Sequence, residues 1–352
     1  LDSTVYLIRG LRDLAALATS KGDTARAAWA SAKAADLESR FEAQWWYGAD
    51  ADSYADSIDD PANPANDNTR IFQRHWIGVT PMEATLRMPD GSIRPLAEPN
   101  HGNIALSQRE RNCYTDPLGM YHTGTGPTSA PGGNPGPSCD SVVSTVPSER
   151  SVFSLNTAVM AVGEGNFGRM GPTQQRHYTT ANARIQLDPS VWETPGAMPE
   201  IAPSPGFGAN IERGFTDRSM MLQAWGTYGT LWPVVHQQLG VSPDLGNGRL
   251  SIVPQVPDGQ PSVSGRSIHL GSGSVDVTAE AGDGFLCTTV RADHLGGVTL
   301  TIGAVLPDGA SVASVTLDGR AVAYRVVQTA RGAEVQVAAG SQHKAKLVIT
   351  LA

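Results

Sequence analysis

The sequence is poor in the features that usually mark metal-binding, nucleic-acid-binding and membrane proteins. It has three cysteines in 352 residues, and no two of them lie close enough in the sequence to form a cysteine metal motif. The net charge of −8 makes a phosphate backbone an unfavourable partner, so nucleic-acid binding is not expected. No apolar run reaches the roughly 18 residues that a membrane-spanning helix needs.

Metal and cofactor motifs are equally scarce. The eight histidines never recur at ligand spacing, and Asp50 and Asp52 lack the remainder of a calcium loop. The stretch "GEGNFG" follows no strand pattern, so it fails the structural context of a dinucleotide-binding loop. We therefore expect no cofactor and no metal, with calcium held by loop carboxylates as the alternative. Lysine is rare and Ser, Thr, Asn and Gly are common, which favours a secreted protein.

Glycine and proline are abundant, at 38 and 24 residues, and predict long ordered loops between regular elements. The longest such loop lies between Cys113 and Cys139. A disulfide between these two cysteines would stabilise the fold by about 3 kcal/mol through the entropy of the unfolded chain. Two unrelated buried thiols are the alternative.

The first 240 residues carry helical patterns. Apolar residues at helical spacing predict a hairpin of two helices, over 3–19 and about 24–47, with Asp23 as the cap of the second. Further helices are predicted from Thr80, over 102–113, from Ser148, over 172–187 and from about 216 to 240. These segments form about three helical hairpins, which resemble half of a toroid.

After Gly248 the apolar pattern alternates with a period of two, in short segments separated by glycine-containing turns. That pattern predicts an antiparallel β-sandwich of about 100 residues. The expected fold class is therefore mainly α with a C-terminal all-β domain. The predicted domains are 1–248, as about half of a helical toroid, and 249–352 as the β-sandwich.

Four motifs, in this order along the chain, resemble the six-hairpin glycosidases, a group that includes glucoamylases, bacterial α-L-rhamnosidases and glycogen-debranching amylo-1,6-glucosidases. The motifs are "FEAQWWYGADADSYADS", "RHWIGVTPMEA", "MPEI" and "QAWGTYGTLWPVVHQQLG". They are most similar to the debranching-enzyme-like secreted proteins of actinobacteria. The resemblance covers essentially the whole chain.

The resemblance implies an (α/α)6 toroid of twelve helices, with the active site in a funnel lined by inter-helix loops. It also implies a general acid from the middle of the barrel and a general base from the loop before the last inner helix. In this family the acid lies about two hundred residues upstream of the base, a position that falls before Leu1. We therefore expect the N-terminal half of the enzyme to be supplied as a separate chain or as a preceding segment.

The loop "VWETPGAMPEIAPSPGF", residues 191–207, stands at the position of the base. An inverting glycosidase needs an ionised carboxylate there to activate water, with the acid ~6.5–9.5 Å away. Glu200 is braced by Pro199 and lies in the "MPEI" motif, so it is the favoured base, and Glu193 is its competitor. The alternative is that these glutamates cap a helix or pair with an arginine.

Aromatic rings stack on the C–H faces of sugars, and flanking polar groups bind hydroxyls. The predicted substrate-binding residues are Trp76 with its neighbours Arg74 and His75, Tyr121 as part of a lid with His122, and Trp192. Loop packing is the alternative for each. The predicted function is an inverting, exo-acting glycoside hydrolase, with α-glucan as the default substrate. A non-catalytic carbohydrate-binding or scaffold protein and a polysaccharide lyase are the alternatives.

Overall fold

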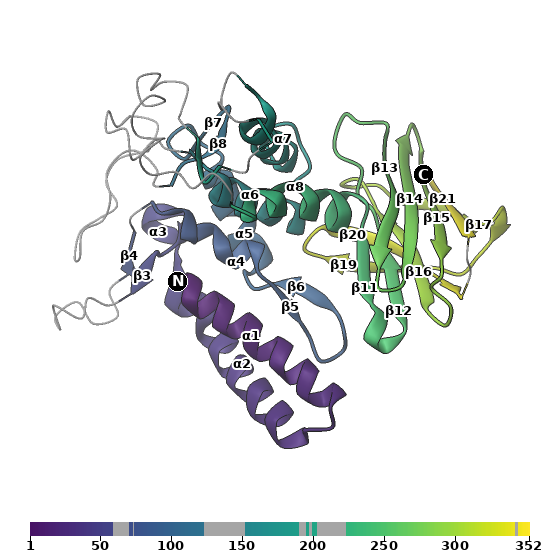
Figure 1. The fold of residues 1–352 in the computed structure, drawn as a ribbon, viewed down its shortest axis with the longest axis horizontal. Coiled ribbons are helices and arrows are strands. Elements are labelled where there is room, and N and C mark those ends of the chain that lie inside the picture. Colours follow the sequence, from purple (N-terminus) through teal and green to yellow (C-terminus); the bar gives the residue numbers. More distant parts are fainter. Residues whose placement is uncertain are drawn as a thin grey trace. The chain divides into compact units, whose positions relative to one another are not determined.

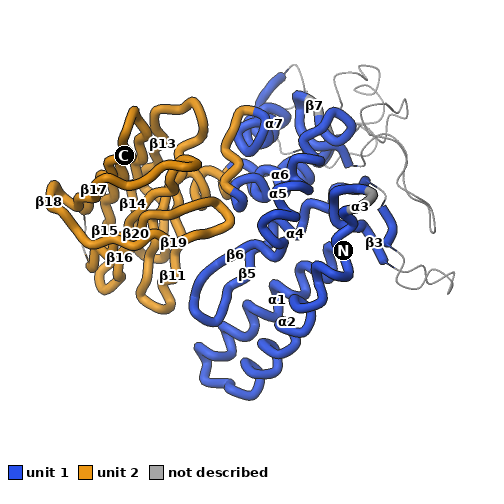
Figure 2. The backbone as a smooth tube through the Cα atoms, turned by 180° about the vertical axis from the view of Figure 1, so that it is seen from behind, with its two compact units in different colours: residues 1–167, 173–230 blue, residues 168–172, 231–352 orange. Residues whose placement is uncertain are grey.

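The computed structural model describes residues 1–58, 70–72, 74–122, 152–189, 195–196, 199–202, 223–341 and 344–352. The chain divides into two compact units (Figure 2). The first comprises residues 1–167 and 173–230, and the second comprises residues 168–172 and 231–352. The predicted boundary lies at residue 248, whereas the contacts place residues 231–248 with the second unit. None of the helices in these ranges is long and apolar enough to span a membrane.

The first unit is mainly helical (Figure 1). Its helices are α1 Asp2–Ser20, α2 Thr24–Trp45, α3 Gly48–Ala51, α4 Thr80–Glu83, α5 Pro99–Arg109, α6 Ser154–Asn166, α7 Gln175–Leu187 and α8 Trp225–Trp232, the last of which ends in the second unit. Two-stranded ladders join them: β1 Trp46–Tyr47 with β2 Ser53–Tyr54, β3 Ser57–Ile58 with β4 Arg70–Ile71, β5 Thr85–Arg87 with β6 Ile93–Pro95, β7 Thr115–Asp116 with β8 Gly119–Met120, and β9 Val152–Phe153 with β10 Ile201–Ala202.

The hairpin of α1 and α2 forms as predicted. The Asp23 side chain accepts a hydrogen bond from the Arg26 N–H at 3.0 Å, which caps the exposed donors at the start of α2. Across the hairpin, Arg12 Nε lies 2.5 Å from Glu38 Oε1, and both side chains are nearly buried. Local capping and the buried apolar stripe of each helix therefore suffice to define this element.

Helix α6 forms the centre of the first unit. All of its residues except Leu155 are buried, so its surroundings cover it on every side rather than along one stripe. Gly163 faces Leu106 of α5 and Met82 of α4, and Gly229 lets α8 pass directly against Ala158. The sequence predicts a single buried face for this helix, because periodicity alone does not reveal that several neighbours pack around it.

Two other helix predictions differ from the structure. The helix expected from Ser148 begins at Ser154, because Val152 and Phe153 are extended and pair with Ile201 and Ala202. The helix expected from about residue 216 is described only from Trp225, and it continues as a π-helical turn over Pro233–Gln238. Proline lacks the N–H of a regular α-helical bond, which accounts for the altered turn at this point.

The second unit is a β-sandwich. One sheet has five strands in the order β11 Val241–Asp244, β12 Arg249–Ile252, β16 Thr299–Val305, β20 Gly332–Gly340 and β19 Arg325–Thr329. The other has six strands in the order β13 Ser262–Leu270, β14 Gly273–Gly282, β15 Phe285–Asp293, β21 Lys344–Leu351, β17 Val312–Leu317 and β18 Arg320–Ala321. Every pairing is antiparallel except that of β12 with β16.

Alternating apolar side chains from both sheets meet in one core. Ile302 and Val337 of the five-stranded sheet share a buried cluster with Val277 and Leu347 of the six-stranded sheet. This arrangement confirms a helical region followed by an antiparallel β-region. That the helical unit is part of a twelve-helix toroid stays a prediction.

Candidate functional site

The backbone of Glu200 is fixed to the first residue of α6. Its carbonyl oxygen accepts a hydrogen bond from the Ser154 N–H at 3.0 Å, and the pairing of β9 with β10 begins one residue later. The Glu200 side chain is partly exposed. The predicted general base therefore lies at the N-terminal end of the central helix, on an anchored backbone.

Two histidines and a phenylalanine gather at the same end of α6. The ring centroids of His75 and His122 are 4.6 Å apart and nearly perpendicular, and those of His122 and Phe153 are also 4.6 Å apart. The His122 carbonyl oxygen accepts a hydrogen bond from the Trp76 N–H at 3.2 Å. We call Glu200, His122, His75, Trp76 and Phe153 the Glu200 cluster; its members come from four separate parts of the chain.

The imidazoles of the cluster are held in the neutral form. Burial, the neighbouring His122 and then Arg109 lower the pKa of His75 to about 4. Burial also lowers the pKa of His122, although the Glu200 carboxylate opposes that shift. At neutral pH both rings are therefore uncharged, and each can donate one hydrogen bond and accept another.

The side chain of Arg74 is buried, unlike those of its neighbours His75 and Trp76. Its φ of 61° is left-handed, and its side chain is only 6% exposed. Its charge acts on the buried Tyr114, whose pKa is raised by burial and lowered in turn by Arg109 and Arg74. The predicted role of Arg74 in binding sugar hydroxyls does not fit this inward orientation.

Arg109 forms the floor beneath the Trp76–Val79 turn. It is fully buried, its guanidinium lies 4.4 Å from the ring centroid of Tyr114, and its Nη2 donates to Ser53 Oγ at 3.3 Å. A side chain at Gly78 would collide with the guanidinium, so glycine is required where the turn crosses the arginine. No spacing motif in the sequence pointed to this residue.

Of the remaining predicted residues, some are described by the structure and others lie outside the described residues. Tyr121 is 2% exposed and packs in an apolar cluster with Leu118, Val152 and Ile185, so its burial does not fit a lid, and His122 beside it joins the Glu200 cluster instead. Glu193, Trp192 and Cys139 lie outside the described residues. Cys113 is buried, and its disulfide with Cys139 stays a prediction.

A second buried carboxyl lies on α4. Glu83 is 4% exposed and accepts hydrogen bonds from the hydroxyl of Tyr6 on α1, at 3.1 Å, and from that of Tyr228 on α8. Arg9 Nη1 lies 3.9 Å from its Oε1. Burial raises the pKa of Glu83, against the opposing hydrogen bonds and charge. The sequence analysis predicted the helix that starts at Thr80 but assigned Glu83 no functional role.

Within the described ranges, no set of three or more His, Cys, Asp and Glu side chains is arranged to hold a metal ion. The Glu200 cluster instead combines one carboxylate, two neutral imidazoles and aromatic rings. Such a set can accept a proton from water, exchange hydrogen bonds with hydroxyl groups and present apolar ring surface.

Comparison with known proteins shows no matching family model and no matching curated protein. Among solved structures, an α-L-rhamnosidase from Dictyoglumus thermophilum aligns with 98% of this chain and 31% of its own at 11% identity and a TM-score of 0.48. The Streptomyces avermitilis α-L-rhamnosidase complexed with L-rhamnose aligns with 99% of this chain and 26% of its own at 12% identity and a TM-score of 0.49. A GH127 β-L-arabinofuranosidase from Geobacillus stearothermophilus T6 aligns with 72% and 38% at 12% identity and a TM-score of 0.28. The chain thus spans less than two fifths of the length of these structures.

Proposed function

We propose that this chain is the part of an inverting glycoside hydrolase that carries the general base, Glu200. The observation that supports the proposal most directly is the Glu200 cluster. A partly exposed carboxylate, two neutral histidines and an indole, all from loop ends predicted to line a sugar site, meet at one end of α6. Glu200, His75, Trp76 and His122 were all predicted from the sequence as site residues. All four are partly exposed, and all four lie in this cluster.

Four of the five members have a defined role in this reaction. The Glu200 carboxylate accepts a proton from the attacking water as that water adds to the anomeric carbon. His75 Nδ1 is buried and makes no hydrogen bond to any residue in the described ranges, so it is available to a sugar hydroxyl. Trp76 and Phe153 are partly buried and offer ring surface for the C–H face of a sugar. Glu193 and Trp192 remain the alternative base and a further binding residue.

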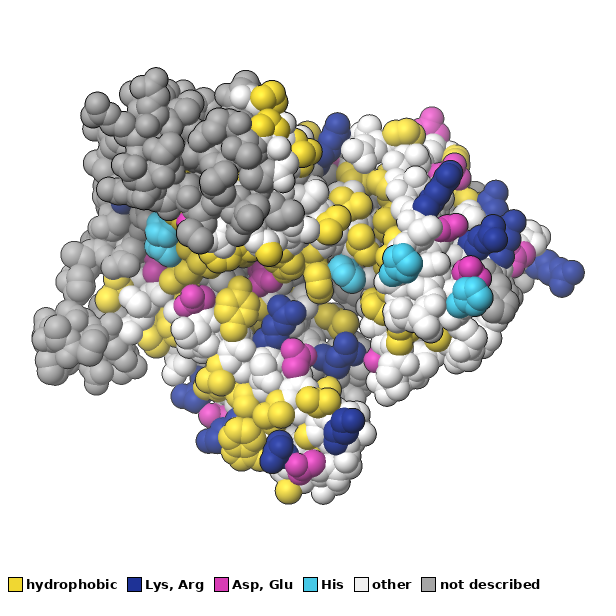
Figure 3. All heavy atoms as spheres, viewed as in Figure 1, with side chains coloured by type: hydrophobic (Ala, Val, Ile, Leu, Met, Phe, Trp, Pro, Cys, Tyr) yellow, Lys and Arg dark blue, Asp and Glu magenta, His cyan; other side chains and the backbone are white. Residues whose placement is uncertain are grey.

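The general acid comes, on this proposal, from an N-terminal half supplied as a separate chain or as a preceding segment. Exposed apolar side chains on the α1 and α2 hairpin support a further covering polypeptide. Leu7, Leu17 and Trp29 are 53%, 57% and 54% exposed, and hydrophobic side chains are visible over this hairpin in Figure 3. Surfaces of this kind are typical of interaction sites.

The finer features are proposals from the sequence. The enzyme is secreted, exo-acting and free of cofactors, with α-glucan as its first candidate substrate and other glycosides as the next. A carbohydrate substrate and an N-terminal half of the enzyme are the partners expected.

The test is release of reducing sugar from a panel of α-glucans, rhamnosides and arabinosides, by this chain alone and by the protein with its upstream half. We expect turnover in the second case, and a loss of about 10²–10⁴-fold in kcat for Glu200→Gln, because the amide accepts no proton from water. Glu280→Gln, on the exposed side of β14, is the matched control and should keep full activity.

Proton NMR of the first product anomer tests inversion. Full turnover in Glu200→Gln would remove the assignment of the base. Saccharide binding without turnover by the assembled protein would instead favour a non-catalytic carbohydrate-binding protein.

A further inference from the structure

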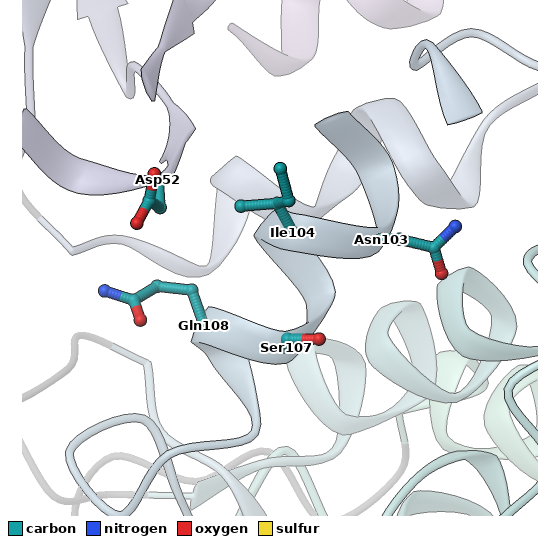
Figure 4. Close-up of a pocket in the computed structure, with 5 residues that line it drawn as sticks. All are labelled: Asp52, Asn103, Ile104, Ser107 and Gln108. Atoms are coloured by element: carbon teal, nitrogen blue, oxygen red, sulfur yellow. The ribbon is translucent and has the colours of Figure 1, made fainter. Parts of the chain in front are cut away.

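A shallow, open pocket of about 340 Å³ lies between the end of α3 and the outer side of α5, apart from the Glu200 cluster. Its lining consists of Asp52, Asn103, Ile104, Ser107 and Gln108. Figure 4 shows Asp52 and Gln108 on the same side of α5, with Ile104 beside them. We propose that this pocket is a second saccharide-binding site that holds one unit of a glycan; the class of ligand rests on the proposed function.

The position of Asp52 is fixed from both sides. The β1–β2 ladder pairs Trp46 with Tyr54 and Tyr47 with Ser53, so Asp52 stands at the end of a short closed loop. On the next residue, the Ser53 hydroxyl accepts a hydrogen bond from Arg109 at the end of α5. The backbone at Asp52 is therefore held at a set distance from the helix that forms the opposite wall.

A second contact fixes the other end of the loop to α5. The indole of Trp46 stacks on the imidazole of His101, with centroids 4.2 Å apart and planes 9° from parallel. His101 is oriented in turn by Glu42, whose Oε2 lies 2.7 Å from its Nδ1. A pocket whose walls are joined at two points loses little entropy when a ligand enters.

The backbone at Asp52 is itself unusual. Its φ of 48° and ψ of 40° are left-handed, a conformation that residues other than glycine adopt less readily. The Asp52 carboxylate makes no hydrogen bond or ion pair with any described residue, although the Asp52 N–H bonds to the Gly48 carbonyl at 3.2 Å. The conformation therefore directs an acceptor into the pocket that no contact within the described chain uses.

Across the pocket, the Oε1 of Gln108 accepts a hydrogen bond from Arg111 Nη1 at 2.8 Å. This contact leaves the amide NH₂ of Gln108 as a donor for a ligand. The wall thus combines a carboxylate acceptor, an amide donor and the apolar surface of Ile104, which is 36% exposed.

This chemistry selects a neutral, hydroxyl-rich ligand. A carboxylate accepts from two adjacent hydroxyls, an amide donates to a third, and an aliphatic side chain covers a C–H face. No lysine or arginine is among the described lining residues, and the charge of Asp52 repels phosphates and carboxylates. A sugar unit satisfies all three wall groups, whereas an anion can accept from Gln108 but gives the Asp52 carboxylate no donor.

Titration calorimetry of the full chain with maltoheptaose, L-rhamnose and L-arabinose tests the proposal. Asp52→Gly is the sharpest variant, because glycine tolerates the left-handed backbone and only the carboxylate is lost. We expect Asp52→Gly to weaken the affinity for the sugar that the wild type binds, by about tenfold or more. Gln108→Ala should also weaken this affinity. Asn100→Ala, an exposed amide on the same helix, is the control that should bind normally.

Unchanged affinity in both pocket variants, or no binding of any of the three sugars by the wild type, overturns the proposal. Failure of the proposed function is separable, because Glu200→Gln leaves the pocket intact. If the protein hydrolyses no sugar but the pocket variants bind sugar more weakly, the hydrolase proposal is wrong and the pocket proposal stands. If hydrolysis depends on Glu200 but sugar binding is unchanged in the Asp52 and Gln108 variants, the hydrolase proposal stands and the pocket proposal is wrong.

Discussion

Glu83 shows how one residue joins distant parts of the chain. Its carboxyl is buried among hydroxyl donors from α1 and α8, and the side-chain amide of Asn166 on α6 donates to its backbone carbonyl at 2.8 Å. Burial without full charge neutralisation favours the protonated carboxyl, so the pKa of Glu83 lies above its unfolded value. A group of this kind makes stability depend on pH.

The raised pKa of Glu83 sets the direction of this pH dependence. The contribution of Glu83 to the free energy of unfolding is fully present below its pKa in the unfolded state, and it is lost as the pH rises through the higher pKa of the folded state. We therefore expect the free energy of unfolding to fall with rising pH in that window. In Glu83→Gln, whose neutral amide resembles the protonated acid, this component of the pH dependence should vanish.

Urea unfolding of both proteins between pH 4 and 8 measures the effect. Asp13→Asn, which removes an exposed carboxylate on α1, is the control and should retain the slope of the wild type. An equal slope in Glu83→Gln and the wild type would contradict the explanation.

At the scale of elements, the sequence predicted what depends on local pattern. The α1–α2 hairpin, α5, α7 and the sandwich strands follow from stripes, caps and alternation. The start of α6 was wrong because the extended conformation at Val152 and Phe153 is imposed by a partner almost fifty residues away. Such long-range pairing leaves no periodic signal in either segment.

The same distinction separates the site residues. Glu200, His75 and Trp76 were predicted from their loop context, and they come together. The burial of Arg74 and the packing of Tyr121 against Ile185 depend on contacts with distant segments, which the sequence does not reveal. Phe153 was missed because its segment was assigned to a helix.

Two helical glycines test the packing of α6. A Cβ at Gly229 would lie 2.5 Å from the Ala158 Cα, which is backbone and cannot yield. Gly229→Ala should therefore destabilise the first unit by about 1–3 kcal/mol. Gly10→Ala on α1 meets no atom within 4 Å and should instead stabilise by about 0.5–1 kcal/mol. Chemical denaturation distinguishes them, and equal effects of the two substitutions would show that α6 and α8 are not in close contact.

At the scale of the whole molecule, α1 has two apolar faces. One buries Val5, Ile8 and Leu11, whereas Leu7 and Leu17 on another face stay exposed, as does Trp29 on α2. A helix with apolar residues on more than one face usually packs on each of them. The second face is consistent with the proposal that a further polypeptide covers it.

Replacing Leu7, Leu17 and Trp29 together with serine tests the role of this surface. The free energy of unfolding of the isolated chain should change by less than about 0.5 kcal/mol per site, because these side chains contribute little burial. Binding of a hydrophobic fluorescent dye should fall markedly, and association with the upstream half should weaken. A large loss of stability would mean that the three side chains are already packed within the chain.

The strand order of the six-stranded sheet has a consequence for assembly. β21 lies between β15 and β17 and pairs with both, although it follows them in the sequence. Until Lys344–Leu351 is in place, β13–β14–β15 and β17–β18 are two separate pieces. Removing this one strand would leave a new unpaired edge on each piece, and such edges template aggregation.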